Sequence, residues 1–202
     1  MLVLGLTGPS GSGKGIVGRF FEEQGIPVLD TDAVYHALIA KPSACTEELK
    51  AVFGDTIITS EGGVNRKRLA ELVFDPTDTE NEKLSHLNRI THRYVLDACR
   101  IWLKEQAENK KRAAVIDAPL LYESGFDKEC DRVIALVASR QVRLARIILR
   151  DGLTAEEGER RLSSQKTDGF YTERADFVIR NEGDVRELKE AVLTVIDRLP
   201  IA

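Results

Sequence analysis

The feature that most constrains this chain is a glycine-rich segment near its start, GPSGSGK at residues 8–14. It follows a short apolar run at residues 2–7 and precedes apolar residues at helical spacing that end at Gly25. A strand, a glycine loop and a helix in this order predict a nest of backbone amides that binds phosphate, with Lys14 and the helix N-terminus adding positive charge. The alternative is a flexible glycine turn.

The rest of the chain alternates in the same way. Short strand patterns lie at residues 27–30, 113–117, 132–137 and 177–179, and helical patterns lie between and after them, at 32–40 and 184–199 among others. Parallel strands need crossover connections, which helices supply, so the pattern predicts an α/β fold with a parallel sheet covered on both faces. A ligand of such a sheet is expected at the carboxyl ends of its strands.

The sequence shows no repeat and no linker that would separate independent domains, so we expect a single domain over residues 1–202. Within it, residues 46–111 lack strand signals and predict a helical insertion. Residues 151–175 form a charged helical arm that opens with a capping-box spacing, Thr154 to Glu157. The core is then assembled from residues 1–45, 112–150 and 176–202.

Composition excludes several classes of protein. The 202 residues carry 33 acidic and 29 basic side chains, a net charge of -4, which does not favour a broad nucleic-acid surface. We expect no membrane or export segment, and a cytoplasmic location. Cys45, Cys99 and Cys130 show no paired spacing, so each is expected to be a buried free thiol. Trp102, within an apolar helical pattern, is expected in the core.

A phosphate loop alone does not specify a reaction, but other motifs narrow the choice. Asn109 to Arg112 lacks the aspartate of a guanine-specificity motif, which disfavours a GTPase. Three further motifs are more specific: DTD with His36 at residues 30–36, DAPLLYESG at 117–125, and RDGL followed by RxxxQ within 150–165. In this order, over residues 4–193, the chain resembles the dephospho-coenzyme A kinase family.

The resemblance implies transfer of the ATP γ-phosphoryl group to the ribose 3′-hydroxyl of dephospho-coenzyme A, the last step of coenzyme A biosynthesis. It implies a five-stranded parallel sheet flanked by helices, a helical acceptor-binding region at 46–111 and a lid at 151–175. ATP is the co-substrate, with Mg²⁺, and the protein is expected to be a monomer or small homo-oligomer. Two alternatives stay open: a nucleoside or nucleotide kinase of the same fold, and an inactive nucleotide-binding module.

Site residues follow from the loop and from the resemblance. The catalytic set comprises Asp32, Lys14 and Arg146. Arg146 and Arg150 share one helix face, so an anion such as the ATP phosphates, or an acid such as Asp151, must lie between them. The expected ATP-binding residues are Gly8, Ser10, Gly11, Ser12, Gly13, Lys14, Gly15, Ile16, Arg150, Arg161 and Asn181.

Asp32, just past the second strand, is expected to be the base that takes the acceptor proton, and the alternative is a helix N-cap. Asp117 is expected to hold Mg²⁺ through water, and its alternative is a polar strand end. The acceptor-binding residues implied are Asp32, His36, Thr91, His92 and Leu120. For His92 the alternative is a histidine at the surface or at a helix end.

The sequence departs from the family pattern at three positions. Gly15 stands where a serine or threonine hydroxyl binds Mg²⁺, so the metal must use phosphate oxygens, waters, carboxylates or a hydroxyl such as that of Ser12. Arg93 replaces a common proline, which bears on a helix break near the acceptor. Arg143 replaces a common glutamine, and we expect little consequence from it.

Overall fold

A computed structural model describes residues 1–74 and 81–201. The chain divides into two compact units: unit 1 comprises Met1–Asp30 and Leu103–Ala202, and unit 2 comprises Thr31–Trp102. These boundaries do not coincide with the helical region expected at 46–111, of which residues 75–80 lie outside the described residues. The functions assigned to the sub-regions stay predictions.

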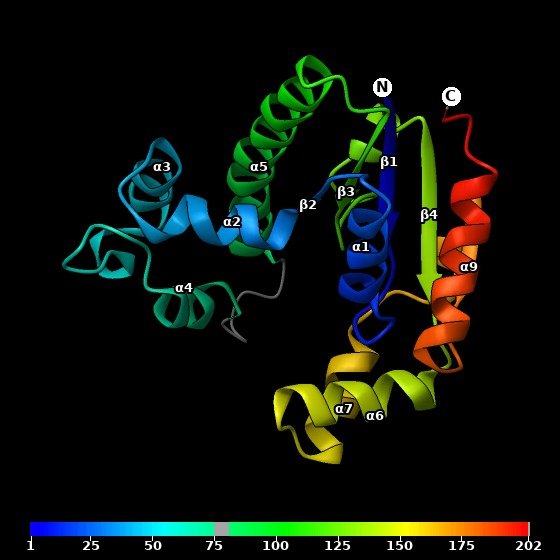
Figure 1. Ribbon diagram of the computed structural model, residues 1–202. Coiled ribbons are helices and arrows are strands. Elements are labelled where there is room, and N and C mark those ends of the chain that lie inside the picture. Colours follow the sequence, from blue (N-terminus) through cyan, green and yellow to red (C-terminus); the bar gives the residue numbers. More distant parts are fainter. Residues whose placement is uncertain (75–80, 202) are drawn as a thin grey trace. The chain divides into compact units, whose positions relative to one another are not determined.

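Unit 1 is built on one five-stranded sheet, ordered β2-β3-β1-β4-β5, in which every neighbouring pair is parallel (Figure 1). The predicted fold class is therefore confirmed. Since all strands run the same way, their carboxyl ends meet at one edge, where β1 leads directly into the glycine loop. The strands are β1 (Leu2–Thr7), β2 (Val28–Asp30), β3 (Ala113–Asp117), β4 (Arg132–Val137) and β5 (Phe177–Arg180).

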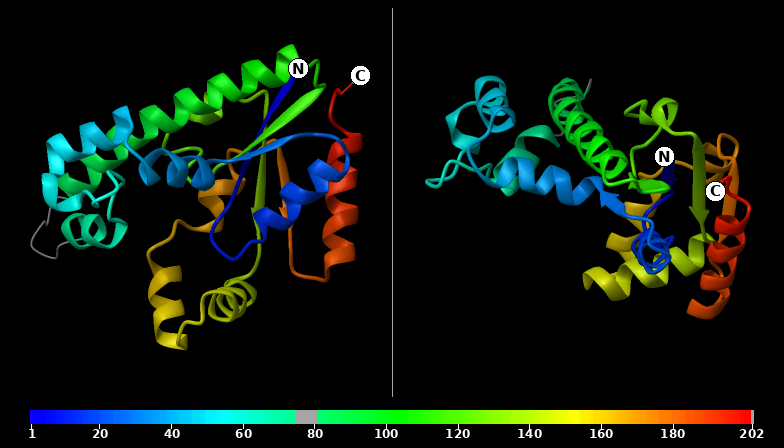
Figure 2. Two further views of the ribbon diagram at one scale, coloured as in Figure 1. Left: turned by 60° about the vertical axis from the view of Figure 1, so that its left-hand side comes forward. Right: turned by 45° about the horizontal axis from the view of Figure 1, so that its top comes forward.

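Five helices belong entirely to unit 1: α1 (Lys14–Glu23), α6 (Arg140–Asp151), α7 (Ala155–Ser163), α8 (Asp168–Thr172) and α9 (Val185–Asp197), with a 3₁₀ turn at Phe126–Glu129. α1 lies beside α9 and packs on the sheet (Figures 1 and 2). The core joins Phe21 of α1 and Val192 of α9 to Leu4, Leu6 and Ile134 of the strands. The apolar face predicted for the last helix therefore packs where expected.

The helix starts in unit 1 follow ordinary capping chemistry. Asp184 accepts hydrogen bonds from the amides of Arg186 and Glu187 at the start of α9. Thr154 and Glu157 form the predicted capping box at the start of α7. α7 is more than a solvated arm, because it packs against α6 and buries Leu162.

Unit 2 is helical: α2 (Thr31–Ala40), α3 (Ala44–Phe53), a 3₁₀ turn at Asp55–Ile57, α4 (Arg66–Val73) and most of α5 (Glu82–Glu108). Its own core contains Ile39, Leu49, Leu69 and Ile90. An isolated antiparallel bridge between residues 58 and 64 is the one strand-like pairing in the described part of unit 2. The expectation of an almost entirely helical segment therefore holds.

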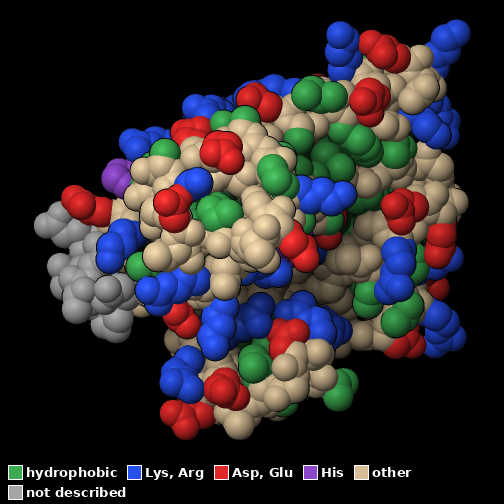
Figure 3. Space-filling view, turned by 90° about the vertical axis from the view of Figure 1, so that its left-hand side faces the viewer, with side chains coloured by type: hydrophobic (Ala, Val, Ile, Leu, Met, Phe, Trp, Pro, Cys, Tyr) green, Lys and Arg blue, Asp and Glu red, His purple; other side chains and the backbone are tan. Residues whose placement is uncertain are grey.

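Several smaller expectations can be compared with the structure. Cys45 and Cys99 are buried as expected and Cys130 is only half-buried, and none of the three forms a disulfide with another described residue. Trp102 is half-buried on α5, which is less burial than its assignment to the core predicts. No helix in the described ranges is both long and apolar enough to cross a membrane. Basic and acidic side chains both occur across the face in Figure 3, as the near-equal totals require.

Candidate active site

The glycine loop connects β1 to α1, and its backbone approaches β4 too closely for other residues. Gly8 has φ 149°, and a Cβ there would lie 2.0 Å from the Leu136 carbonyl oxygen. Gly13, the N-cap of α1, has φ 103°, and its Cβ would lie 2.6 Å from Asn181 Nδ2. Glycine is required at both positions by conformation and by space. The loop thus has the strand-loop-helix setting of a phosphate nest.

Asn181 supports the glycine loop through a side-chain hydrogen bond. It follows β5, and its side-chain Nδ2 donates to the Ser12 carbonyl oxygen at 2.7 Å, while its own amide donates to Val137 O at 2.8 Å. Arg146 of α6 donates to the Asn181 backbone oxygen at 3.1 Å and to its Oδ1 at 3.2 Å. Arg146 and Asn181, two predicted site residues, are therefore in direct contact in the structure.

Lys14 and Gly15 begin α1. The Lys14 ammonium donates to the Gly8 carbonyl oxygen at 3.2 Å, so it lies over the loop it follows. Gly15 is exposed, and a Cβ there would meet no atom within 4 Å. The Ser12 hydroxyl is buried and has no hydrogen-bond partner among residues 1–74 and 81–201. An orphaned buried hydroxyl within a phosphate loop suits a ligand that arrives with the nucleotide.

Two carboxylates, those of Asp117 and Asp30, end neighbouring strands at the carboxyl edge of the sheet. Asp117 ends β3, is buried, and is paired in register with Leu6 on one side and Asp30 on the other. Oxygen donors of this kind, one or two carboxylates with phosphate oxygens and water, are what Mg²⁺ prefers. The described residues contain no group of three or more His, Cys, Asp or Glu that could hold a metal. The donor set therefore fits an Mg²⁺ ion carried by nucleotide phosphates.

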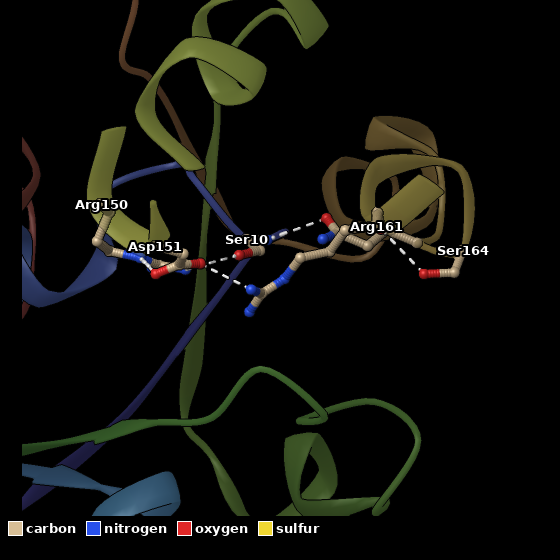
Figure 4. A network of polar contacts seen from close by, with 6 residues as sticks. Ser10, Arg150, Asp151, Arg161 and Ser164 are labelled. Carbon is tan, nitrogen blue, oxygen red and sulfur yellow. Dashed lines mark hydrogen bonds and ion pairs between the residues drawn. The ribbon is translucent and has the colours of Figure 1, made fainter. Parts of the chain in front are cut away.

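Asp151 connects two arginines expected to bind ATP (Figure 4). Arg150 donates to it through Nε at 2.7 Å and Nη2 at 2.8 Å, and Arg161 of α7 donates through Nη1 at 2.7 Å. The hydrogen bond with Arg150 is the main reason that the pKa of Asp151 lies below its usual range. Arg150 also reaches the Ser10 hydroxyl at 3.4 Å, which places both arginines near the loop. Arg150 therefore has the pairing with Asp151 that was one of the alternatives from the sequence, whereas Arg146 bonds to Asn181.

Arg143 was missed by sequence reasoning. It is buried on α6, where Nε donates to Ala138 O at 3.1 Å and Nη1 donates to Gln165 Oε1 at 3.2 Å. Its Nη2 also lies 3.4 Å from a carboxylate oxygen of Asp168. A buried guanidinium that contacts Ala138, Gln165 and Asp168 stabilises the packing of these parts of the chain. The expectation of little consequence is therefore wrong. No local signal marks it, because all three partners depend on the tertiary fold.

Most acceptor-binding candidates lie in unit 2. Asp32 is exposed in the first turn of α2, which begins at Thr31, so Asp32 is not its N-cap. His36 is exposed on the same helix, 5.5 Å between ring centroids from Tyr35. On α5 the buried Thr91 hydroxyl donates to the Leu87 carbonyl oxygen at 2.8 Å. Burial lowers the pKa of the neighbouring His92.

Two further positions complete the comparison with the sequence. Leu120 belongs to unit 1, follows β3, and leaves 46% of its surface exposed, so the acceptor candidates are divided between the units. α5 runs through Arg93 without interruption, and no helix break occurs there. Arg93 pairs with Glu48 of α3, which also accepts a hydrogen bond from Tyr94 at 3.0 Å. Arg93 thus ties α5 to α3 within unit 2.

Comparisons with known proteins agree with this geometry. A family model described as dephospho-CoA kinase matches residues 2–187. The dephospho-CoA kinase of Fusobacterium nucleatum is 36% identical over 193 residues, 95% of each chain, and that of Dehalococcoides mccartyi is 35% identical over 203 residues, 100% of each. The crystal structure of TT1252 from Thermus thermophilus superposes with a TM-score of 0.79 at 29% identity, covering 98% of this chain and 97% of that one.

Proposed function

The chain belongs to the dephospho-CoA kinase family, and from this we propose how its own residues carry out the reaction. The enzyme transfers the γ-phosphoryl group of ATP to the ribose 3′-hydroxyl of dephospho-CoA, giving CoA and ADP in CoA biosynthesis. The observation that carries the assignment of roles is the glycine nest between β1 and α1, with Lys14 lying over it at 3.2 Å from Gly8 O. Phosphoryl transfer depends chiefly on positioning and on neutralising charge, and this loop is suited to both.

In this proposal the glycine loop and Lys14 bind the ATP phosphates, although Pro9 has no N–H and the Ser10 amide donates to Gln165 instead. Arg150 and Arg161, whose side chains are 57% and 46% exposed, turn toward the same phosphates. Arg146 adds positive charge beside the loop, while its two hydrogen bonds keep Asn181 against Ser12. Residues 151–175, which contain Arg161, close over the nucleotide and exclude water, so that ATP is not hydrolysed.

Asp32 is proposed as the base. The ribose 3′-oxygen attacks the γ-phosphorus, the bond from that phosphorus to the ADP oxygen breaks, and the 3′-hydroxyl proton passes to the Asp32 carboxylate. Support comes from its position two residues after Asp30, which lies in register with Asp117 at the carboxyl edge of the sheet. His36, Thr91, His92 and Leu120 are proposed to contact the acceptor.

Mg²⁺ is proposed to accompany ATP, where it neutralises phosphate charge. Asp117, through water, and the orphaned Ser12 hydroxyl are the residues that would hold it, because Gly15 offers no oxygen side chain. We also propose a cytoplasmic protein that acts as a monomer or small homo-oligomer on small-molecule substrates. The three cysteines form no disulfide within the described part of the chain, which supports a reducing environment.

A coupled ADP-release assay tests the function. Purified protein is given ATP and Mg²⁺ with dephospho-CoA, adenosine, AMP or no acceptor. Dephospho-CoA should support ADP release far above the other three. A preference for adenosine or AMP would favour a nucleoside or nucleotide kinase, and nucleotide binding without acceptor-dependent ADP would favour an inactive module.

Two substitutions test the roles. Asp32→Asn should keep ATP binding and lower kcat by at least about 100-fold, the usual effect of removing a general base. Lys14→Ala should instead weaken ATP binding directly. Glu47→Gln, at an exposed carboxylate of α3 in the same unit, is the matched control and should leave both quantities unchanged. Near-normal turnover of Asp32→Asn would remove Asp32 as the base.

A further inference from the structure

One amide of the phosphate loop is already bonded in the structure. The Ser10 N–H donates to the side-chain oxygen Oε1 of Gln165 at 3.1 Å, across 155 residues of sequence. Gln165 lies between α7 and α8, in the segment that carries Arg161 of the proposed lid. The phosphate loop and this segment are therefore joined directly by a hydrogen bond to the loop backbone, and not only through arginine side chains.

Gln165 is itself fixed by a buried cation. Its Oε1 accepts a second hydrogen bond from Arg143 Nη1 at 3.2 Å, and its backbone amide donates to Leu162 O at 3.1 Å. Arg143 cannot easily turn away, because Nε is held by Ala138 O at 3.1 Å and its guanidinium faces Asp168. An oxygen that accepts from a guanidinium and from an amide at once is tightly constrained, and a charged donor strengthens the bond.

We propose that Gln165 is a positioning residue for phosphoryl transfer: held by Arg143, it fixes the Ser10 amide and with it the shape of the phosphate loop. The inference rests on the proposed function, in which this loop binds the ATP phosphates. In this proposal Gln165 keeps its bonds to Ser10 and Arg143 when ATP is bound, since Arg143 is buried and is also held by Ala138 and Asp168. Positioning of this kind lowers the cost of ordering the loop around phosphate.

The opposite role would give the opposite result. If Gln165 merely occupied the Ser10 amide until phosphate displaced it, removing its oxygen would strengthen ATP binding. If it is a positioning residue, removing the oxygen weakens ATP binding, because the loop must then be ordered by the nucleotide. The direction of the change in the KM for ATP therefore separates the two roles.

The test compares two substitutions of nearly equal size. Gln165→Met removes the accepting oxygen, whereas Gln165→Glu keeps an oxygen that can accept from both Ser10 and Arg143. Gln141→Met is the matched control, since Gln141 is an exposed glutamine of α6 outside residues 151–175. For each protein we would measure kcat, the KM for ATP, the KM for dephospho-CoA and the midpoint of thermal unfolding.

Gln165→Met should raise the KM for ATP about tenfold, the size expected for one hydrogen bond reinforced by a charge, and leave the KM for dephospho-CoA within about twofold. Gln165→Glu and Gln141→Met should stay close to the parent in all four quantities. An unchanged or lower KM for ATP in Gln165→Met overturns the proposal, as does an equal rise in Gln165→Glu. A merely structural role would move both KM values together with the unfolding midpoint.

Arg143 supplies an independent check. If Gln165 acts through Arg143, Arg143→Met should raise the KM for ATP, and the double variant should be little worse than either single variant, because the two side chains form one unit. Strictly additive effects would show that Gln165 acts without Arg143. A parent protein that releases no ADP with dephospho-CoA would count against the proposed function, whereas an active parent with unaffected variants counts against Gln165 alone.

Discussion

Arg161 of α7 donates to Asp151 at the end of α6, with 2.7 Å between Nη1 and Oδ2. The same carboxylate receives two hydrogen bonds from Arg150. Two guanidinium groups that would repel one another are thus held together by one anion. Asp151 therefore supplies, from within the protein, the negative charge that Arg150 and Arg161 need between them.

This cluster should shape the acid stability of the protein. The pKa of Asp151 is lowered from its ordinary value of 3.8, chiefly by the Arg150 hydrogen bond. Its contribution to stability is therefore complete above that ordinary value and is lost as pH falls through the lower pKa of the folded state. In thermal unfolding between pH 2 and 7, the parent should be more stable than Asp151→Asn at neutral pH, and the difference should shrink below pH 4. A difference that is constant with pH would contradict this.

Gly15→Ser should lower the Mg²⁺ requirement. A Cβ at Gly15 meets nothing within 4 Å, so the new side chain fits, and its hydroxyl supplies an oxygen ligand that Gly15 lacks. The Mg²⁺ concentration for half-maximal ADP release should fall about fivefold, as for one added interaction of about 1 kcal/mol. Gly15→Ala is the control, because it adds the same Cβ without oxygen. Coinciding Mg²⁺ titrations of the Ser and Ala variants would exclude a role for the hydroxyl.

Asn181→Ala should affect both stability and nucleotide binding. The substitution leaves the Ser12 carbonyl oxygen without the Nδ2 donor at 2.7 Å and removes one of the two acceptors of Arg146. Unfolding in urea should show a loss of about 2 kcal/mol, and the KM for ATP should rise. Asn109→Ala, at an exposed asparagine after α5, should change neither. Unaltered stability of Asn181→Ala would mean that the loop does not depend on this contact.

His92 should make the protein less stable in mild acid. Burial lowers its pKa from the ordinary 6.5, so the folded state prefers the neutral imidazole. Stability is therefore unaffected above about pH 6.5 and falls as pH drops from there toward the lower pKa of the folded protein. The unfolding midpoint of His92→Gln should decline less between pH 6.5 and 5 than that of the parent. His86→Gln, at an exposed position of the same helix, should follow the parent.

The sheet could be predicted from sequence because its signals are local. β3 and β4 have the predicted bounds, 113–117 and 132–137, since each is a short β-rich run ended by polar residues. The glycine loop was equally clear, because GxxxxGK between a strand and a helix has few other uses. The capping box at the start of α7 could be predicted from four consecutive residues, Thr154 to Glu157.

Contacts over long distances in the chain could not be predicted in this way. The hydrogen bond from Asn181 to Ser12 spans 169 residues, and only the family resemblance drew attention to Asn181. Little consequence was expected from Arg143, whose burial depends on contacts with Ala138 before α6 and with Gln165 and Asp168 about twenty residues further along the chain. Trp102 is less buried than predicted, because an apolar residue in a helical pattern need not be fully covered.

Finally, β2 and β3 are parallel neighbours, so the chain must travel from the carboxyl end of one to the amino end of the other. Residues 31–112, including the 27-residue α5, make that obligatory crossing, and they contain all of unit 2. Closing a longer connection costs little, about 0.6 kcal/mol for each doubling of its length. In an architecture of this kind the segment that connects β2 to β3 can be replaced by a different one while the sheet, the glycine loop and the arginine cluster are kept.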